Sequence, residues 1–517
     1  ASRCCSILTT TWKSEFLMNS LLDRTLFALT VLFFGVIATA HASTKIDAPL
    51  AQALNEDPGE PRTVLIRLHD DSARSALQLL APGTDRPRQV TELLRTHADR
   101  TQAPLRTWLA AQNIASRSYW LGNLLRIEAD APTIKAIASR DDVVAVLWDR
   151  VWRQSLPSPQ PQLRSGFDVQ AIEASLSHIG APQVWATGIL GQDVVIAGQD
   201  TGYQWDHPAL RVAYRGWDGV TADHNYNWHD AIHELIGGGV NSCGLDMPTP
   251  CDDHNHGTHT MGTMVGDDGN SNQIGIAPGA RWIGCRNMEE GDGTPSTYTE
   301  CFQWFIAPTA LDGSDPDPDL APHIINNSWG CPESEGCTEA EIALMQDVVE
   351  AVRAAGILVV ASAGNSGSAC GSIDAPPAIY TAAFTVGATT VPNDTIASFS
   401  SRGPVVGGLL KPDVTAPGVS IRSSVTGNFY ASFNGTSMAG PHVAGTAALM
   451  MSVNPALRRN PGAVETILRE TAVPITSAQS CGGFDGGLVP NAVFGHGRID
   501  AWAAFRVAET IFAHDFE

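Results

Sequence analysis

Positive charge is scarce in this sequence, which has 32 Lys and Arg against 54 Asp and Glu, for a formal net charge of −22. The deficit lies in 155–517, which carries about −24, whereas 62–154 carries about +4, so we expect the two regions to attract each other. An acidic surface also keeps a protein soluble. The sign of the larger region argues against nucleic acid as its partner.

The sequence contains neither a Cys-x-x-Cys pair nor a His-Glu-x-x-His motif, which are signatures of metal and redox sites. Zinc-ribbon, thiol-redox and zinc-protease sites are therefore disfavoured. Internal repeats and long low-complexity tracts are also absent, and 43% apolar residues with 48 Gly and 32 Pro are typical of a globular, loop-rich protein. Eight of the ten cysteines lie in the acidic region and predict disulfides, with their pairing left open.

No apolar run is suited to span a membrane, since the stretch from Leu26 to Ala40 has only 15 residues and polar chain follows it. It ends in Ala-His-Ala at 40–42, a small-x-small cleavage signature. We therefore predict a bacterial secretory signal peptide at 18–42 and a secreted protein without a membrane span in its mature form. We interpret 1–17 as the product of an upstream start site.

Residues 62–149 predict a compact α+β domain with the order β-α-β-α-β. The expected strands are 63–68, 117–128 and 143–147, and the expected helices are 87–112 and 131–139. A Pro-rich stretch at 156–161 follows. We therefore expect 150–174 to be an exposed linker in which maturation cleavage takes place.

From 175 to 508, apolar runs alternate with helical stretches. The runs lie at 194–197, 282–284, 324–325, 357–361 and 383–386. Continuous apolar strands predict a mostly parallel central sheet with helices on both faces, which is an α/β fold. Ligands of such sheets bind at the carboxyl ends of the strands. The short tail at 509–517 is either a sorting signal or a frayed end.

Ser437 is the candidate nucleophile. It opens a helical, small-residue stretch, and the free backbone N–H groups of a helix N-terminus stabilise a developing negative charge. A serine that merely caps the helix would produce the same local pattern. The choice between the two interpretations depends on residues upstream.

Asp200 and His256 supply the remaining groups of a catalytic triad. Asp200 follows the expected strand at 194–198, and His256 opens a second small-residue helix. An imidazole held by a buried carboxylate can take a serine proton. Asp200 could instead form a turn, and an aspartic protease would need a second Asp-Thr-Gly or a dimer. A metal site at His254, His256 and His259 is the other alternative.

Asn365 lies in a Gly-Asn-Ser-Gly segment after the apolar run 357–361. A side-chain amide at a strand end can donate a hydrogen bond to an oxyanion. A plain Gly-Asn turn is the competing interpretation.

These segments resemble the subtilase family of serine endopeptidases. The resemblance rests on Asp-Thr-Gly at 200–202, His-Gly-Thr-His at 256–259 and Gly-Thr-Ser-Met-Ala at 435–439, in the order Asp, His, Ser. It covers about 178–507 and extends to the following segments: 325–330, 399–404, 411–418 and 495–501. Within the family, 223–230 and 284–288 look most like the bacillopeptidase F group.

The resemblance implies roles for further residues. Asp200, His256 and Ser437 would form the triad, Asn365 would donate to the oxyanion, and 62–149 would be a propeptide that acts as intramolecular chaperone and inhibitor. Substrate backbone would pair beside Ser328, Trp329 and Gly330, with pocket walls that include Gly364. Trp329 could equally be a core aromatic.

Two acidic features carry weaker hypotheses. Asp374 falls near the expected floor of the pocket for the residue before the scissile bond (P1), which suggests a basic P1, or it caps a turn. Many subtilases bind calcium, so structural calcium is compatible with the resemblance, although no cofactor is required for the chemistry. The Asp-Pro-Asp-Pro-Asp at 315–319 suits a rigid connection better than a calcium loop.

The sequence therefore predicts a secreted serine endopeptidase, made as a zymogen, that hydrolyses protein substrates. A catalytically silent binding protein of the same fold is one alternative, separable by reaction with a fluorophosphonate. A serine esterase is the other alternative. It needs the motif Gly-x-Ser-x-Gly, but the position of the second Gly is occupied by Ala439.

Overall fold

The structure is a computed structural model that describes residues 45–80, 83–157, 159, 172–237, 241–332 and 336–514. The predicted signal peptide at 18–42 and residues 158, 160 and 161 of the Pro-rich stretch therefore lie outside the described residues. No helix in the described ranges is long and apolar enough to cross a membrane.

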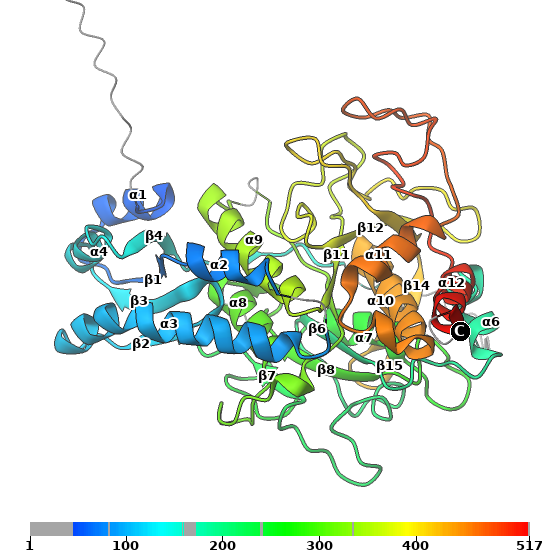
Figure 1. The fold of residues 1–517 in the computed structure, drawn as a ribbon, viewed down its shortest axis with the longest axis horizontal. Helices are drawn as coiled ribbons and strands as arrows, with labels where there is room; N and C mark the ends of the chain where they lie inside the picture. Colours follow the sequence, from blue (N-terminus) through cyan, green and yellow to red (C-terminus); the bar gives the residue numbers. More distant parts are fainter. Residues whose placement is uncertain are drawn as a thin grey trace, which may run out of the picture. The chain divides into compact units, whose positions relative to one another are not determined.

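The N-terminal region is an antiparallel sheet with helices packed on it (Figure 1). Its strands are β1 (Arg62–Leu68), β2 (Ser116–Tyr119), β3 (Leu124–Ala129) and β4 (Val143–Trp148), in the order β2-β3-β1-β4. Its helices are α1 (Ala48–Glu56), α2 (Asp71–Leu77), α3 (Arg86–Ala111) and α4 (Ala131–Ala138).

The prediction of one strand over 117–128 is wrong. The chain forms β2, a short 3-10 turn η1 (Leu121–Asn123) and β3, which pairs antiparallel with β2. Gly122 has φ of 71° and Asn123 has φ of 52°, and these left-handed residues reverse the chain. The Gly-Asn pair at 122–123 is a turn signal between two apolar runs, and the prediction of one strand passed over it.

The central sheet of the larger region has seven strands, all parallel, in the order β13-β12-β11-β10-β6-β8-β7. Five strands fall at the expected runs, namely β6 (Val195–Asp200), β8 (Arg281–Arg286), β10 (Ile324–Asn327), β11 (Leu358–Ser362) and β12 (Phe384–Thr389). Two were not anticipated, β7 (Trp228–Asp230) and β13 (Val414–Pro417). The predicted parallel α/β fold is confirmed.

Alternate residues of each strand enter different cores. Ile196 packs with the core that contains α7 (His256–Val265), α10 (Thr436–Val453) and α12 (Ala501–His514), whereas Ala197 packs toward α8 (Pro295–Ile306) and α9 (Glu339–Ala354). Figure 1 shows this sheet between the two sets of helices. Burial on both faces explains why the strands are continuously apolar.

Capping residues determine where the two outer helices begin. Thr294 forms a capping box with Thr297 at the start of α8, and Thr338 forms one with Glu341 at the start of α9. The remaining elements are α5 (Ala174–His178), α6 (Ala181–Trp185), α11 (Pro461–Glu470), a hairpin of β14 (Ile421–Val425) and β15 (Phe429–Phe433), and the short pair β5 (Trp152–Arg153) and β9 (Asp292–Gly293).

The eight cysteines of the acidic region form four disulfides, which confirms the prediction and supplies the pairing. They are Cys243–Cys251, Cys285–Cys301, Cys331–Cys337 and Cys370–Cys481. At the other end of this region, α12 continues to His514, so the predicted boundary between 508 and 509 falls inside a helix.

Candidate active site

Asp200 and His256 meet at the carboxyl end of the central sheet. Asp200 is the last residue of β6, and its Oδ1 lies 2.7 Å from Nδ1 of His256, the first residue of α7. Both side chains are buried. Gly257 permits this approach, because a Cβ there would lie 2.0 Å from the Gly202 carbonyl oxygen and 3.1 Å from Asp200 Cβ.

Asp252 joins the loop after Asp200 to the start of α7. Its Oδ1 accepts from Thr201 Oγ1 at 2.8 Å and from the backbone N–H groups of His254 and Asn255, and its Oδ2 accepts from Thr258 N and Oγ1. This carboxylate holds the two segments that present Asp200 and His256. The sequence analysis missed it, although an Asp shortly before a helix is a recognisable capping signal.

Ser437 is the second residue of α10 and is 4% exposed. Its Oγ lies 3.4 Å from the Ser328 carbonyl oxygen. Nε2 of His256 is buried and has no hydrogen-bond partner among the described residues, so no bond joins it to Ser437 in this arrangement. The structure thus pairs Asp200 with His256 and sets Ser437 at a helix N-terminus, with its hydroxyl turned toward Ser328.

Asn365 lies beside Ser437 in the cleft and contacts the start of α10. Its Oδ1 accepts from Thr436 N at 2.9 Å and from Thr436 Oγ1 at 3.0 Å, and Thr436 Oγ1 in turn accepts from Gly364 N. Because the oxygen is occupied in this way, the amide NH2 group is what Asn365 can offer to a ligand. The side chain is exposed and lines the cleft.

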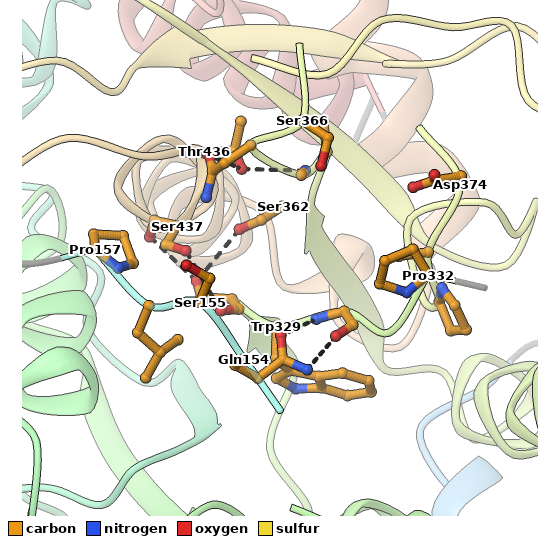
Figure 2. A pocket seen from close by; sticks show the side chains of 18 residues that line it. Gln154, Ser155, Pro157, Trp329, Pro332, Ser362, Ser366, Asp374, Thr436 and Ser437 are labelled. Carbon is orange, nitrogen blue, oxygen red and sulfur yellow. Dashed lines mark hydrogen bonds between the residues drawn. The ribbon is translucent and has the colours of Figure 1, made fainter. Parts of the chain in front are cut away.

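A cleft of about 290 Å³ contains Ser437, Asn365 and all four predicted substrate-binding residues, Ser328, Trp329, Gly330 and Gly364 (Figure 2). Trp329 itself is only 3% exposed, and its ring packs on Tyr298 with 4.2 Å between ring centroids. Its side chain is therefore mainly a core aromatic, whereas the neighbouring backbone faces the cleft.

The same cleft holds part of the chain's own N-terminal region. β5 pairs antiparallel with β9, and Gln154 N donates to the Gly291 carbonyl at 3.0 Å. On the opposite wall, Gln154 Oε1 accepts from Gly330 N at 3.0 Å and Gln154 Nε2 donates to the Gly330 carbonyl. Gln154 to Pro157 line the cleft, so the start of the predicted linker is bound rather than free.

The three clustered histidines do not converge on one point. His256 faces Asp200, whereas His259 Nε2 contacts the carbonyls of Ile421 and Ala431. Burial lowers the pKa of His259 to about 3, and burial together with the neighbouring His256 lowers the pKa of His254. Within the described residues no group of three or more His, Cys, Asp or Glu is arranged to hold a metal ion.

Glu300 of α8 is at the centre of a cluster of polar and charged contacts that does not include Ser437. Its carboxylate accepts from His229 Nε2 at 2.9 Å and His233 Nε2 at 2.8 Å, and from two N-terminal residues, Arg117 at 2.9 Å and Tyr119 at 3.0 Å. Burial raises the pKa of Glu300, but the hydrogen bonds from the two histidines lower it more, so the net shift is well below its usual range.

Comparison with known proteins identifies the fold at this point. A model of the subtilase family matches residues 191–497, a range that includes Asp200, His256, Asn365 and Ser437. The chain belongs to the subtilase family. The match begins after the N-terminal sheet and after the segment that lies in the cleft.

Individual subtilases show the same relationship. Over 433 residues, 80% of this chain, it is 35% identical to bacillopeptidase F of Bacillus subtilis (strain 168), but it spans only 28% of that protein's length. It is 31% identical over 338 residues to subtilisin Savinase of Lederbergia lenta, covering 65% of this chain and 100% of that protein. Alkaline elastase YaB of Bacillus sp. (strain YaB) is 34% identical over 288 residues, covering 56% of this chain and 62% of that protein.

Proposed function

We propose that this subtilase is a secreted serine endopeptidase, synthesised as a precursor whose own N-terminal region blocks the cleft. The observation that carries the proposal is the path of 152–157: β5 pairs with β9, Gln154 hydrogen-bonds to Gly291 and Gly330, and Pro157 lines the same cleft as Ser437. An extended chain paired to a strand edge is how a protease holds a peptide. The cleft is therefore suited to bind peptide backbone with little demand on sequence.

The residues around the cleft supply the groups for acyl transfer. His256 Nε2 takes the Ser437 proton as Oγ attacks the peptide carbonyl, and Asp200 holds Nδ1–H of the imidazole and stabilises the imidazolium. The proton then passes to the leaving amine, and water repeats the attack on the acyl-enzyme. Before this step the Ser437 hydroxyl must turn from Ser328 toward His256, as often happens when substrate binds.

The negative charge on the tetrahedral intermediate needs donors that are already in place. The NH2 group of Asn365 and the backbone N–H of Ser437 at the start of α10 provide them. Thr436 fixes the orientation of the Asn365 amide through two hydrogen bonds. This assignment explains why Asn365, although exposed, is held rigidly.

The N-terminal region has the properties of a detachable inhibitor. It is joined to the larger region by a shared apolar cluster, by arginine–carboxylate pairs and by β5, and the four disulfides among the described residues lie between 243 and 481. Cleavage in 150–174 would leave it bound until it dissociates or is degraded. The disulfides also support export, because such bonds persist in oxidising compartments.

A serine-to-alanine change tests the function directly. We expect purified Ser437→Ala protein to lose casein hydrolysis by at least about a thousandfold, to lose labelling by a fluorophosphonate, and to keep its N-terminal region uncut. Ser452→Ala, on the same helix, is the matched control and should leave all three intact. Casein hydrolysis by Ser437→Ala at the wild-type rate would refute the proposal, and tributyrin cleavage without casein cleavage would favour an esterase.

A further inference from the structure

We infer that Ser437 cuts its own precursor at the bond between Ser155 and Leu156, and that the Trp152 side chain sets the register of this cut. The inference rests on the proposed peptidase function and names the bond at which that function releases the N-terminal region. It is drawn from the described residues 152–157 and from the walls that hold them.

Trp152 anchors the segment at its upstream end. It pairs with Gly293 between β5 and β9, and it is only 2% exposed. Its ring stacks on that of Tyr298 with 5.3 Å between the centroids, and Tyr298 in turn packs on Trp329. The indole Nε1–H donates to Glu341 Oε1 at 3.5 Å. A large ring enclosed in this way fixes which residue of the chain lies beside Gly293.

Gln154 holds the chain two positions further on. Its backbone N–H donates to the Gly291 carbonyl at 3.0 Å, and its side-chain amide accepts from Gly330 N at 3.0 Å and donates to the Gly330 carbonyl. The Gln154 carbonyl oxygen faces the turn before β9, because a Cβ built on Gly291 would lie 3.3 Å from it. This carbonyl is engaged at that wall, so the Gln154–Ser155 bond is not the one presented to Ser437.

Pro157 holds the chain at the downstream end. Its ring packs at Gly435, two positions before Ser437, where an added Cβ would lie 3.0 Å from Pro157 Cγ. Figure 2 shows the labelled Ser155 and Pro157 in the cleft that contains Ser437. Between the contacts of Gln154 and those of Pro157, only the two bonds on either side of Leu156 are left to face the nucleophile.

The chemistry of the leaving nitrogen separates these two bonds. In the Leu156–Pro157 bond it is the ring nitrogen of proline, which has no N–H and is crowded by the ring carbons where His256 must deliver a proton. In the Ser155–Leu156 bond it is an ordinary secondary amide. The Leu156 side chain also turns toward Gly291, where an added Cβ would lie 3.1 Å from Leu156 Cδ1. The small Ser155 side chain leaves its own carbonyl open to attack.

The cut is one complete acyl transfer. Ser437 Oγ bonds to the Ser155 carbonyl carbon as His256 takes the Oγ proton, and the C–N bond to Leu156 breaks as this proton passes to the Leu156 nitrogen. Water then adds to the ester, and its proton returns through His256 to Ser437 Oγ. The N-terminal fragment ends in a carboxylate at Ser155, and the subtilase fragment begins at Leu156.

The bond is located on the full chain by intact mass of both fragments and N-terminal sequencing of the larger one, in the earliest products to appear. We expect fragments that end at Ser155 and begin at Leu156. Ser437→Ala should yield neither fragment, because no other group in the cleft supplies the nucleophile.

Variants of the segment test the register. Trp152→Ala should slow the cut at least about tenfold, because the bond is no longer held at the nucleophile. Arg153→Ala is the matched control on the same strand, since the Arg153 side chain is 74% exposed, and it should be cut at the wild-type rate. Thermal unfolding of both changes in the uncut Ser437→Ala chain shows that each still folds.

Two variants act on the bonds themselves and do not depend on Trp152. Leu156→Pro places a proline nitrogen in the proposed bond and should abolish the cut there, whereas Leu156→Ala should keep it. Pro157→Ala turns the next bond into an ordinary amide, and it should still be cut after Ser155.

Three results would overturn the inference and leave the peptidase proposal standing. They are a first cut at another bond by enzyme that reacts with a fluorophosphonate, a Trp152→Ala chain that is cut at the wild-type rate, and a cut after Ser155 in Ser437→Ala. Protein that neither reacts with the fluorophosphonate nor hydrolyses casein would overturn both.

Discussion

The contact between the N-terminal region and the subtilase region is noncovalent among the described residues, whereas the subtilase region is crosslinked internally. Leu121 and Leu147 of the N-terminal region and Leu344 of α9 belong to one buried apolar cluster. Every ion pair between the described residues of the two regions places an arginine on the N-terminal side and a carboxylate on the other. The pairs are Arg67 and Arg74 with Asp347, Arg88 with Asp319, Arg117 with Glu300, Arg126 with Glu234, Arg150 with Glu341, and Arg153 with Asp292. The opposite charges expected from the sequence meet at this boundary.

The subtilase region, in contrast, is internally crosslinked. Its four disulfides include Cys370–Cys481, which joins residues 111 positions apart. A crosslink across a long loop restricts the unfolded chain and stabilises the fold. The contact between the two regions combines the shared apolar cluster with ion pairs, and no disulfide among the described residues adds to it.

The first prediction tests the packing around Asp200 and His256 in the subtilase region. In Gly257→Ala, the new methyl group would collide with the Gly202 carbonyl and shift His256 relative to Asp200. We expect kcat/KM on a peptide substrate to fall about a hundredfold or more, because small displacements of a catalytic group are costly. The N-terminal region should still bind.

Gly462→Ala in α11 is the control for this change, since the nearest atom to its added Cβ is the flexible end of Arg353 at 3.8 Å. Its kcat/KM should match wild type. A Gly257→Ala enzyme with unchanged kcat/KM would show that the close approach of α7 to β6 is not needed for catalysis.

A second prediction concerns the contact between the N-terminal region and the subtilase region. Asp347 on α9 accepts from both Arg67 and Arg74, and its side chain is only 9% exposed. Asp347→Ala should weaken binding of the cleaved N-terminal region by about 2 kcal/mol, or roughly thirtyfold in Kd, because two arginines lose their partner in a half-buried setting. The Kd is measured as inhibition of mature enzyme by the cleaved region.

The exposed pair Arg88–Asp319 supplies the contrast, since these side chains are 49% and 66% exposed. Arg88→Ala should weaken binding much less than Asp347→Ala, because an exposed ion pair contributes little. Glu350→Ala, on the same helix as Asp347, should leave the Kd unchanged. Equal losses in Asp347→Ala and Arg88→Ala would contradict the view that burial decides which pairs hold the regions together.

The smallest effect depends on pH. Burial lowers the pKa of His233, but the hydrogen bond to Glu300 and its charge raise it more, so the net shift is upward. A raised pKa stabilises the fold below the unfolded value of about 6.5, and this contribution is lost as the pH rises through the folded value. Glu300, with its lowered pKa, stays charged throughout this window.

We therefore expect His233→Gln to destabilise the uncut Ser437→Ala chain by about 1 kcal/mol more at pH 6 than at pH 9. Thermal unfolding at the two pH values measures the difference, with His69→Gln, at an exposed contact to the Asp141 carbonyl, as control. The prediction fails if the loss is the same at both values, or larger at pH 9.

Some features of the structure were not predicted from the sequence, because they depend on contacts between segments. The single strand predicted over 117–128 is two strands, because Gly122 and Asn123 form a turn between them. The linker predicted at 150–174 was expected to be exposed, but Gln154 within it hydrogen-bonds to both Gly291 and Gly330. The role of Asp252 was not predicted. Its carboxylate accepts hydrogen bonds from Thr201 and Thr258, and only the fold brings these two residues together.

The sequence by itself determined the family, the order of Asp200, His256 and Ser437, and the parallel sheet, because short motifs and continuous apolar strands are local properties of the chain. Tertiary structure decided the rest. The 2.7 Å contact of His256 with Asp200, the Cys370–Cys481 bond and the hydrogen bonds of Gln154 to Gly330 all join residues far apart in the chain. Such distances follow from how the strands, helices and loops pack, and a local pattern carries no record of that packing.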